Sequence, residues 1–246
     1  MKGGMVPAAM ALARLMLAGA LAAAGCGGAR GPREPEPPRD PPLVAVAELD
    51  DTIVEDIRYA GPDNFTGAPV PGYEAPRCLL VEPAARALVA VQAELQSQGL
   101  GLVVFDCYRP RRAVEHFLAW AAQPDPRGDP GTRERHYPNV PGSELVARGY
   151  IAATSAHSRG ATVDAGLVAF DSWGGTTPLD MGTPFDFFDP RSAADAADVA
   201  PEARENRRVL REAMQRHGFR PLPQEWWHFT YQPEPYPDRD FDVPVR

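Results

Sequence analysis

The chain has 246 residues, of which 44% are hydrophobic, and this length and composition suit one globular domain with additional tails. Its formal net charge is −8 and its isoelectric point lies near 5.2. This acidic balance argues against a protein that binds nucleic acid, because such proteins are usually basic.

The first 26 residues are typical of a targeting segment rather than of a folded domain. Residues 15–24 form an apolar run, which is too short for a transmembrane helix because such a helix needs about 20 apolar residues. The run ends in Ala-Ala-Gly-Cys at residues 23–26, which resembles a bacterial lipobox. We therefore expect an exported protein, periplasmic or at the cell surface, held at a membrane by a lipid on Cys26. Secretory cleavage without a lipid is the alternative.

Residues 27–42 (GGARGPREPEPPRDPP) consist mostly of glycine, proline and charged residues. Such a segment cannot bury enough apolar surface to fold. Its prolines favour an extended spacer of about 3.1 Å per residue, so the segment could reach on the order of 50 Å. We expect it to tether a folded domain that spans residues 43–246.

The folded part alternates between helical and strand patterns. Apolar residues recur at spacings of three and four over 83–98, whereas apolar and polar residues alternate over 163–167. Separated strands and helices of this kind predict a single α+β domain, with a central antiparallel sheet that carries the functional site and helices that flank it. The expected helices are 83–98, 110–122 and 201–217, the expected strands are 49–59, 100–107, 163–167 and 226–231, and the expected loops are 63–73 and 123–142.

Two cysteines remain besides Cys26, and they are Cys78 and Cys107. An even number of cysteines in an oxidising compartment favours a disulfide. Such a bond would close a loop of about 30 residues and stabilise the fold by about 3 kcal/mol. Two buried thiols are the alternative, because the sequence does not show whether the two Cα atoms are close enough to be bridged.

Two short motifs carry the chemistry of this chain. The first runs from Ser155 through His157 to Asp164 (SAHSRGATVD), and the second is Glu225-Trp-Trp-His228. Together they supply two imidazoles, one carboxylate ligand and one spare carboxylate. Three nitrogen or oxygen ligands that leave a fourth position open are typical of a catalytic zinc site. The spare Glu225 is the general base that such a site requires.

The spacing within each motif restricts the local structure. His157 and Asp164 would lie roughly 23 Å apart in a fully extended chain, so the chain must turn between them. Gly160 can provide that turn because glycine adopts backbone angles that other residues avoid. Glu225 and His228 would point to opposite faces of a regular strand. We therefore expect Glu225 in the turn that enters the last strand, with its carboxylate over the open side of the metal.

Three further histidines belong to no such motif. His116 lies in an expected helix and His136 in the expected polar loop, while His217 ends a helix, where a positive charge interacts favourably with the helix dipole. We interpret all three as structural or surface residues.

The two motifs resemble those of the zinc peptidases grouped with lysostaphin, D-Ala-D-Ala carboxypeptidases and hedgehog domains. Within this group the chain closely resembles the D-alanyl-D-alanine dipeptidase (VanX-type) family, over roughly residues 50 to 232. The resemblance implies one zinc ion per chain, with His157, Asp164 and His228 as its ligands and Glu225 as the base. The stretch 106–110 (DCYRP) resembles the family's Tyr-Arg-Pro segment and implies that Arg109 lies beside the scissile carbonyl.

The resemblance also implies a substrate pocket. The segments around Arg58-Tyr59-Ala60 and Gly72-Tyr73 resemble the family's N-terminal pocket segment, which implicates Tyr59 and Tyr73. The segment 181–187 (MGTPFDF) resembles the one whose aspartate receives the substrate ammonium, which points to Asp186. Ser155 matches a serine that lines the pocket.

The expected function is zinc-dependent hydrolysis of the small dipeptide D-Ala-D-Ala in cell-wall dipeptide turnover, with Glu225 as base and acid and Arg109 as oxyanion stabiliser. A zinc D,D-carboxypeptidase or another muropeptide peptidase is the alternative within the same chemistry. A non-catalytic zinc-bearing binding module is a third reading, but such a module needs neither Glu225 nor Arg109. The leader and the tether are absent from the family's cytoplasmic resistance enzymes, and the cysteine pair also suggests an exported form. These departures argue against a resistance role more than against the chemistry.

Overall fold

The computed structural model describes residues 40–123 and 130–246. The expected targeting segment (1–26) and nearly all of the expected tether (27–42) lie outside the described residues. Within the described part, no helix is both long and apolar enough to cross a membrane.

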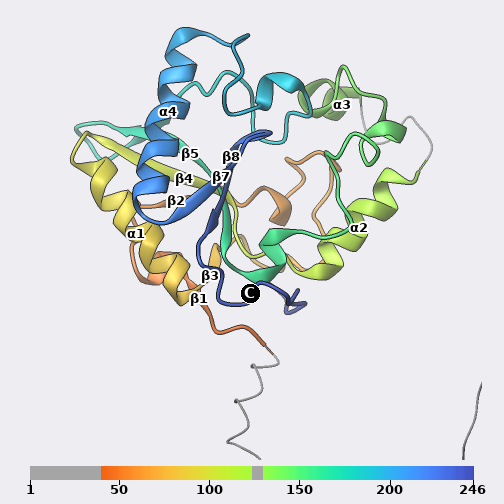
Figure 1. Ribbon diagram of the computed structural model, residues 1–246, viewed down its shortest axis with the longest axis horizontal. Coiled ribbons are helices and arrows are strands. Elements are labelled where there is room, and N and C mark those ends of the chain that lie inside the picture. Colours follow the sequence, from red (N-terminus) through yellow and green to blue (C-terminus); the bar gives the residue numbers. More distant parts are fainter. Residues whose placement is uncertain (1–39, 124–129) are drawn as a thin grey trace, which may run out of the picture. The chain divides into compact units, whose positions relative to one another are not determined.

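A six-stranded sheet forms the centre of the described fold (Figure 1). Its order is β2-β4-β5-β8-β7, and β6 pairs with the C-terminal end of β5. All neighbouring strands are antiparallel except β2 and β4, which are parallel. The strands are β2 (Val54–Glu55), β4 (Leu100–Asp106), β5 (Thr162–Phe170), β6 (Thr176–Pro178), β7 (Phe219–Leu222) and β8 (Glu225–Tyr231), and a separate two-stranded sheet pairs β1 (Leu43–Ala45) with β3 (Leu79–Val81).

Helices lie on both sides of the sheet (Figure 1). Helices α1 (Glu82–Gln96) and α4 (Pro201–Arg216) contact each other on one side, while α2 (Arg111–Ala121) and α3 (Pro130–His136) lie on the other. The apolar stripe of α1, which includes Leu88, Val91 and Leu95, is fully buried. Short 3-10 helices complete the described fold: η1 (Val46–Glu48), η2 (Arg58–Ala60), η3 (Gly142–Glu144), η4 (Ala156–Arg159) and η5 (Pro190–Ser192).

The expected α+β class is confirmed, with the parallel pair β2–β4 as a departure from a purely antiparallel sheet. The expected helices over 83–98, 110–122 and 201–217 coincide with α1, α2 and α4. The expected loop over 123–142 is wrong in part, because it contains α3. The expected strand over 49–59 is also wrong in part, because only the two residues of β2 are extended and paired.

The register of the central strands determines where the site lies. Asp106 on β4 pairs with Asp164 on β5, and Asp164 pairs in turn with His228 on β8. The three residues therefore form one row across three neighbouring strands. A register irregularity on β4, between Val104 and Asp106, accompanies this row.

Candidate metal centre and active site

His157 lies in the turn that the sequence predicts. Ser155 precedes η4, and its hydroxyl oxygen accepts a hydrogen bond from the His157 amide at 3.3 Å. Gly160 ends η4 with a φ of 76°, and a Cβ atom there would approach Leu43 and Val81 to 3.0 and 3.1 Å. Glycine is thus required for both its backbone angle and its lack of a side chain.

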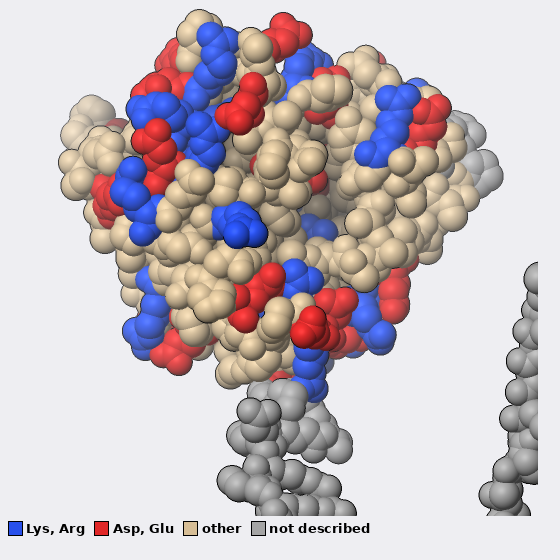
Figure 2. All heavy atoms as spheres, viewed as in Figure 1, with Lys and Arg blue, Asp and Glu red and all other residues tan. Residues whose placement is uncertain are grey.

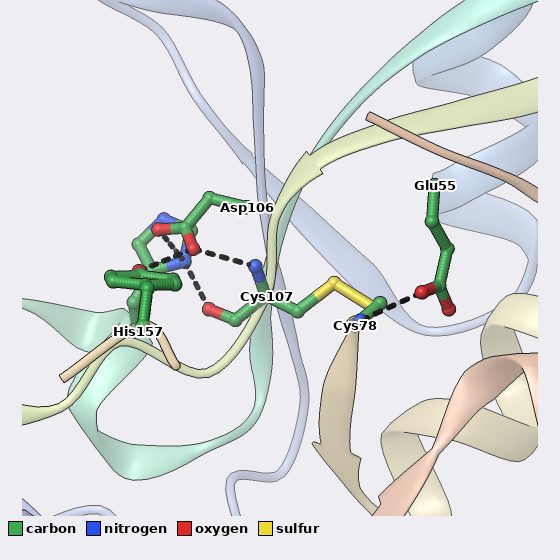
Figure 3. The surroundings of a disulfide bond; sticks show 6 residues. Glu55, Cys78, Asp106, Cys107 and His157 are labelled. Atoms are coloured by element: carbon green, nitrogen blue, oxygen red, sulfur yellow. Dashed lines mark hydrogen bonds and ion pairs between the residues drawn. A yellow bond between two sulfur atoms is a disulfide. The ribbon is translucent and has the colours of Figure 1, made fainter. Parts of the chain in front are cut away.

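The hydrogen bond of the His157 ring selects the nitrogen that faces the site. Nδ1 donates to the carbonyl oxygen of Cys107 at 2.7 Å (Figure 3). Nε2 is therefore unprotonated in the neutral ring and available as a metal ligand, an arrangement that is common for metal-binding histidines.

The three expected ligands converge on one point. His157 Nε2 and His228 Nδ1 lie 3.2 and 3.1 Å from Asp164 Oδ1, and the two nitrogens are 3.3 Å apart. Ligands about 2.0–2.1 Å from a tetrahedral zinc ion would be about 3.3–3.4 Å from one another, close to these separations. Asp164 Oδ1 is buried and accepts no hydrogen bond from the described residues. These residues therefore fit a divalent metal ion.

Glu225 lies beside this centre, as its expected role requires. It is the first residue of β8, directly after the two-residue turn that leads from Leu222, with which it pairs. The register shifts between Pro221 and Leu222, so Glu225 and His228 do not follow the regular alternation, and Glu225 Oε2 lies 3.6 Å from His228 Nδ1. Burial raises the pKa of Glu225, which the neighbouring His228 partly opposes. A raised pKa suits a carboxylate that must take up a proton.

Arg109 extends from the end of β4 toward the ligands. Its Nε and Nη2 atoms lie 2.9 and 2.8 Å from Asp106 Oδ2, and Nη2 lies 3.8 Å from Asp164 Oδ2. Burial alone would lower the pKa of Arg109, but the Asp106 carboxylate and other nearby groups hold it above its usual range. The guanidinium thus remains a fixed positive charge next to the centre.

Asp106 is a buried member of the site to which the sequence assigned no role. It accepts hydrogen bonds from the Tyr73 hydroxyl at 2.6 Å and the Cys107 amide at 2.9 Å, in addition to those from Arg109. It also lies 3.4 Å from Nδ1 of His157 (Figure 3). The sequence contains a signal for this role, because Asp106 is a carboxylate at the end of an apolar strand and lies three residues before Arg109.

A cavity of about 280 Å³ opens onto the metal centre. The three ligands line this cavity together with all other expected site residues except Tyr73. The Tyr73 hydroxyl instead donates a hydrogen bond to Asp106. Those that line it are Tyr59, Arg109, Ser155, His157, Asp164, Asp186, Glu225 and His228.

Asp186 is a buried carboxylate in the cavity wall. Its Oδ2 accepts a hydrogen bond from the Tyr59 hydroxyl at 2.7 Å. Burial raises the pKa of Asp186 well above its usual range, and the charge of Asp164 adds to this effect, whereas the bond from Tyr59 opposes it. Its backbone φ is 56°, a left-handed conformation that is uncommon for residues other than glycine.

His136 contacts the backbone of Asp186 without lining the cavity, which agrees with its interpretation as a structural residue. It ends α3, is buried, and its Nδ1 donates to the carbonyl oxygen of Asp186 at 3.1 Å. No local pattern could reveal this contact, because it joins residues 50 positions apart in the chain.

Cys78 and Cys107 form a disulfide, so the first of the two alternatives is correct. The bond joins the segment before β3 to the end of β4, with the two Cα atoms 5.2 Å apart. Cys107 follows Asp106, and its carbonyl oxygen accepts the hydrogen bond from His157 (Figure 3). The covalent link thus lies directly behind a metal ligand.

A His-Asp-His centre on a mixed sheet, with a glutamate and an arginine in the adjoining cavity, defines a metallopeptidase. The peptidase M15 family described as D-Ala-D-Ala dipeptidase matches residues 40–246, and the chain belongs to this family. Its relatives include three proteins named D-alanyl-D-alanine dipeptidase. The one from Streptomyces coelicolor is 45% identical over 81% of this chain and 96% of its own length. The one from Enterococcus faecium is 42% identical over 78% of this chain and 92% of its own length. The one from Escherichia coli is 35% identical over 76% of this chain and 83% of its own length.

Proposed function

We propose that this protein hydrolyses the dipeptide D-Ala-D-Ala to two molecules of D-alanine, with one zinc ion held by His157, Asp164 and His228. The observation that carries the proposal is the cavity in which this centre, Glu225, Arg109 and the buried carboxylate of Asp186 meet. Relatives named D-alanyl-D-alanine dipeptidase, which align over most of the chain, support the same substrate.

Two imidazoles and one carboxylate with an open fourth position suit zinc. When bound, zinc supplies Lewis acidity, which lowers the pKa of water and polarises the peptide carbonyl. Glu225 takes the proton from the attacking water and later delivers it to the leaving amine. Arg109 stabilises the negative charge that develops on the carbonyl oxygen, because its guanidinium cannot lose its proton at working pH.

Selectivity for a free dipeptide follows from the closed wall beside Asp186. The Asp186 carboxylate, held by Tyr59, would pair with the ammonium group of the substrate. A second cavity of about 390 Å³ lies behind the wall. In three pairs of consecutive residues, the first residue lines the second cavity and the next residue lines the cavity at the metal centre: Arg58 and Tyr59, Phe185 and Asp186, and Trp226 and Trp227. The wall between the two cavities is therefore about one residue thick.

This wall distinguishes the proposed activity from a D,D-carboxypeptidase. A substrate with an acylated amino end would place a neutral amide against Asp186 and extend its chain into the wall. The decisive measurement compares hydrolysis of D-Ala-D-Ala with that of N-acetyl-D-Ala-D-Ala by the purified zinc-loaded protein. Cleavage of the free dipeptide alone supports the proposal, whereas equal cleavage of both peptides contradicts it.

The base is tested by the Glu225→Gln variant. Because Glu225 is not one of the three ligands, we expect this variant to bind zinc while turnover falls by about 100- to 10,000-fold, the range typical of general acid–base catalysis. Retention of full activity with normal zinc content would show that another group is the base. Zinc binding without turnover by the wild-type protein would instead favour the binding-module reading.

We further propose that the protein is exported and attached to a membrane by a lipid on Cys26. The apolar run and lipobox-like residues 23–26 support this location, and a disulfide is more stable in an oxidising compartment. Fractionation of cells that produce wild type or Cys26→Ser tests it. Membrane association that persists in the variant would contradict the lipid anchor.

A further inference from the structure

The segment that carries Asp186 has little regular structure of its own. Between Met181 and Ala193 it contains only the short helix η5. Asp186 nevertheless has to keep a left-handed backbone conformation and a defined distance from the metal centre. A conformation of this kind persists only where neighbouring groups hold it in place.

Arg207 of α4 holds both ends of this segment. Its side chain is buried, with only 2% of the residue exposed. Nε donates to the carbonyl oxygen of Met181 at 2.6 Å, and Nη1 donates to those of Arg191 and Ala193 at 3.0 and 2.8 Å. One planar guanidinium thus connects the start of the segment with its end.

The surroundings of Arg207 are unusual for a buried cation. None of the ion pairs found among residues 40–123 and 130–246 includes it. Burial lowers the pKa of Arg207 to about 10, which still leaves it charged at neutral pH. A buried charge is costly unless hydrogen bonds compensate it, and here the acceptors are backbone carbonyls of one segment. An apolar side chain would fill the same space without that cost, so the guanidinium indicates a need for directed bonds.

A second chain of hydrogen bonds links the same segment to the strand of Glu225. The indole nitrogen of Trp226 donates to Thr183 Oγ1 at 2.9 Å, and this atom lies 3.1 Å from Ser192 Oγ. Ser192 donates to the carbonyl oxygen of Phe187 at 2.6 Å. The Arg207 guanidinium lies over the Trp226 ring, 5.8 Å from its centroid. The position of the segment is therefore coupled to β8, which carries Glu225 and His228.

We infer that Arg207 is a positioning residue for substrate recognition: by tying the two ends of the 181–193 segment, it places the Asp186 carboxylate where the free amino end of the substrate is read. This inference rests on the proposed function of Asp186. Arg207 itself does not line the cavity and would act only through the segment.

The test compares Arg207→Met and Arg207→Lys with Arg208→Met as a matched control. Arg208 is the next residue of α4, but it is exposed and pairs with Glu205 and Glu212. Each purified zinc-loaded variant is assayed for kcat and KM with D-Ala-D-Ala, for turnover of N-acetyl-D-Ala-D-Ala, for zinc content and for melting temperature.

We expect Arg207→Met to raise the KM for the free dipeptide by about tenfold or more, the factor that corresponds to about 1.4 kcal/mol of lost binding. Zinc content should be unchanged, kcat should change little, and the preference for the free over the acetylated peptide should fall. Arg207→Lys should not restore KM, because a single ammonium cannot reproduce the planar fork that reaches both ends. Arg208→Met should behave like the wild type. If Arg207→Met does not fold, the lysine variant alone decides between the outcomes.

A double-mutant cycle with Asp186→Asn separates positioning from a general loss of stability. If Arg207 acts through Asp186, the effect of Arg207→Met on KM should largely disappear in the Asp186→Asn background. A lower melting temperature with wild-type KM and peptide preference would overturn the inference. Failure of the proposed function would look different, because the wild type itself would then cleave both peptides equally or Asp186→Asn would leave KM unchanged.

Discussion

At the scale of single residues, the proposed catalytic groups are oriented by buried neighbours. Asp106 is the clearest case, because its carboxylate receives Tyr73, the Cys107 amide and Arg109 at once. Arg109 is held on the metal side by this contact and by the aromatic rings of Tyr59 and Phe117, whose centroids lie 5.1 and 5.3 Å from it. The guanidinium that we propose to stabilise the oxyanion is therefore positioned by a buried ion pair.

Asp106→Asn should weaken this arrangement without removing a metal ligand. The neutral amide has a similar shape but cannot neutralise Arg109, whose guanidinium can then turn toward the Asp164 carboxylate, 3.8 Å away. We expect kcat for D-Ala-D-Ala to fall by about 10- to 100-fold, which is typical when a partner behind a metal site is lost. Steady-state kinetics and zinc affinity by chelator competition measure the effect. Unchanged kcat would show that Arg109 needs no fixed partner.

Asp189 gives the stability of the fold a predictable response to acid. Its buried carboxylate receives Arg191 Nε at 2.9 Å and Asn139 Nδ2 at 2.9 Å, and the bond from Arg191 lowers the pKa of Asp189 to about 2. Because the folded-state pKa lies below the unfolded value of about 3.9, the contact stabilises the fold above pH 4 and is lost as the pH falls toward 2. Since Arg191 is partly exposed, the gain is about 1–2 kcal/mol.

We therefore expect Asp189→Asn to unfold more easily than the wild type at pH 6, and the difference between the two proteins to shrink as the pH falls from 4 to 2. Urea unfolding at a series of pH values measures this difference. A constant difference over the whole range would mean that the asparagine variant loses packing rather than a charged contact.

The residues that the sequence could reveal are those whose chemistry is visible in a short motif. The sequence predicts that His157, Asp164, Glu225 and His228 meet, because a metal site requires these residue types, and the structure brings the three ligands together. His136 and Arg207 could not be assigned roles in this way, because they contact backbone carbonyls of residues far along the chain, and such contacts leave no pattern in the sequence.

At the scale of elements, the helices and strands predicted from the sequence agree with the structure where apolar periodicity is strong. Helices α1 and α4 and strands β4 and β5 bury clear apolar stripes or runs. Helix α3 (PGTRERH) lacks such a stripe, so nothing in its sequence distinguishes it from a polar loop. Strand β7 contains Pro221 and lies at the edge of the sheet, where a missing amide donor is tolerated. Both elements depend on tertiary contacts rather than on local preference.

The disulfide is the covalent link between two elements behind the site. Replacement of both cysteines by alanine frees a loop whose ends are 29 residues apart and should lower the free energy of unfolding by about 3–4 kcal/mol in the loop-entropy model. Because Cys107 also accepts the hydrogen bond from His157, we expect zinc to dissociate faster from this variant. Thermal unfolding and zinc release to a chromogenic chelator measure the two effects.

The reduced wild-type protein is the matched control for that variant, because it lacks the bond but keeps both side chains. Faster zinc release in both forms would tie the effect to the covalent link. Normal zinc release in both, with only a lower melting temperature, would show that β3 and β4 hold Cys107 in place without it.

At the scale of the whole molecule, distant parts of the chain converge behind the metal centre. The residues after β8 return to the turn of His157, where the Phe241 amide donates to the Ser158 carbonyl at 2.9 Å and Glu234 pairs with Arg159 at 2.6 Å. Phe241 and Val245 are buried in the core.

On the surface, basic and acidic side chains are interspersed over α4 rather than gathered into a patch of one sign (Figure 2). On this face, α4 therefore carries paired charges of both signs.

The convergence of the chain behind the metal centre predicts that metal removal destabilises the entire domain. Without a cation, the buried carboxylate of Asp164 faces two imidazoles with one oxygen that accepts no hydrogen bond from the described residues, so the folded state should bind zinc far better than the unfolded chain. A ligand at 100 times its dissociation constant stabilises a fold by about 2.7 kcal/mol, which should raise the melting temperature by several degrees. We expect a chelator to lower the melting temperature and added zinc to restore it. His228→Ala should abolish this shift, whereas Glu225→Gln, which keeps all three ligands, should retain it. An equal shift in wild type and His228→Ala would place the stabilising metal elsewhere.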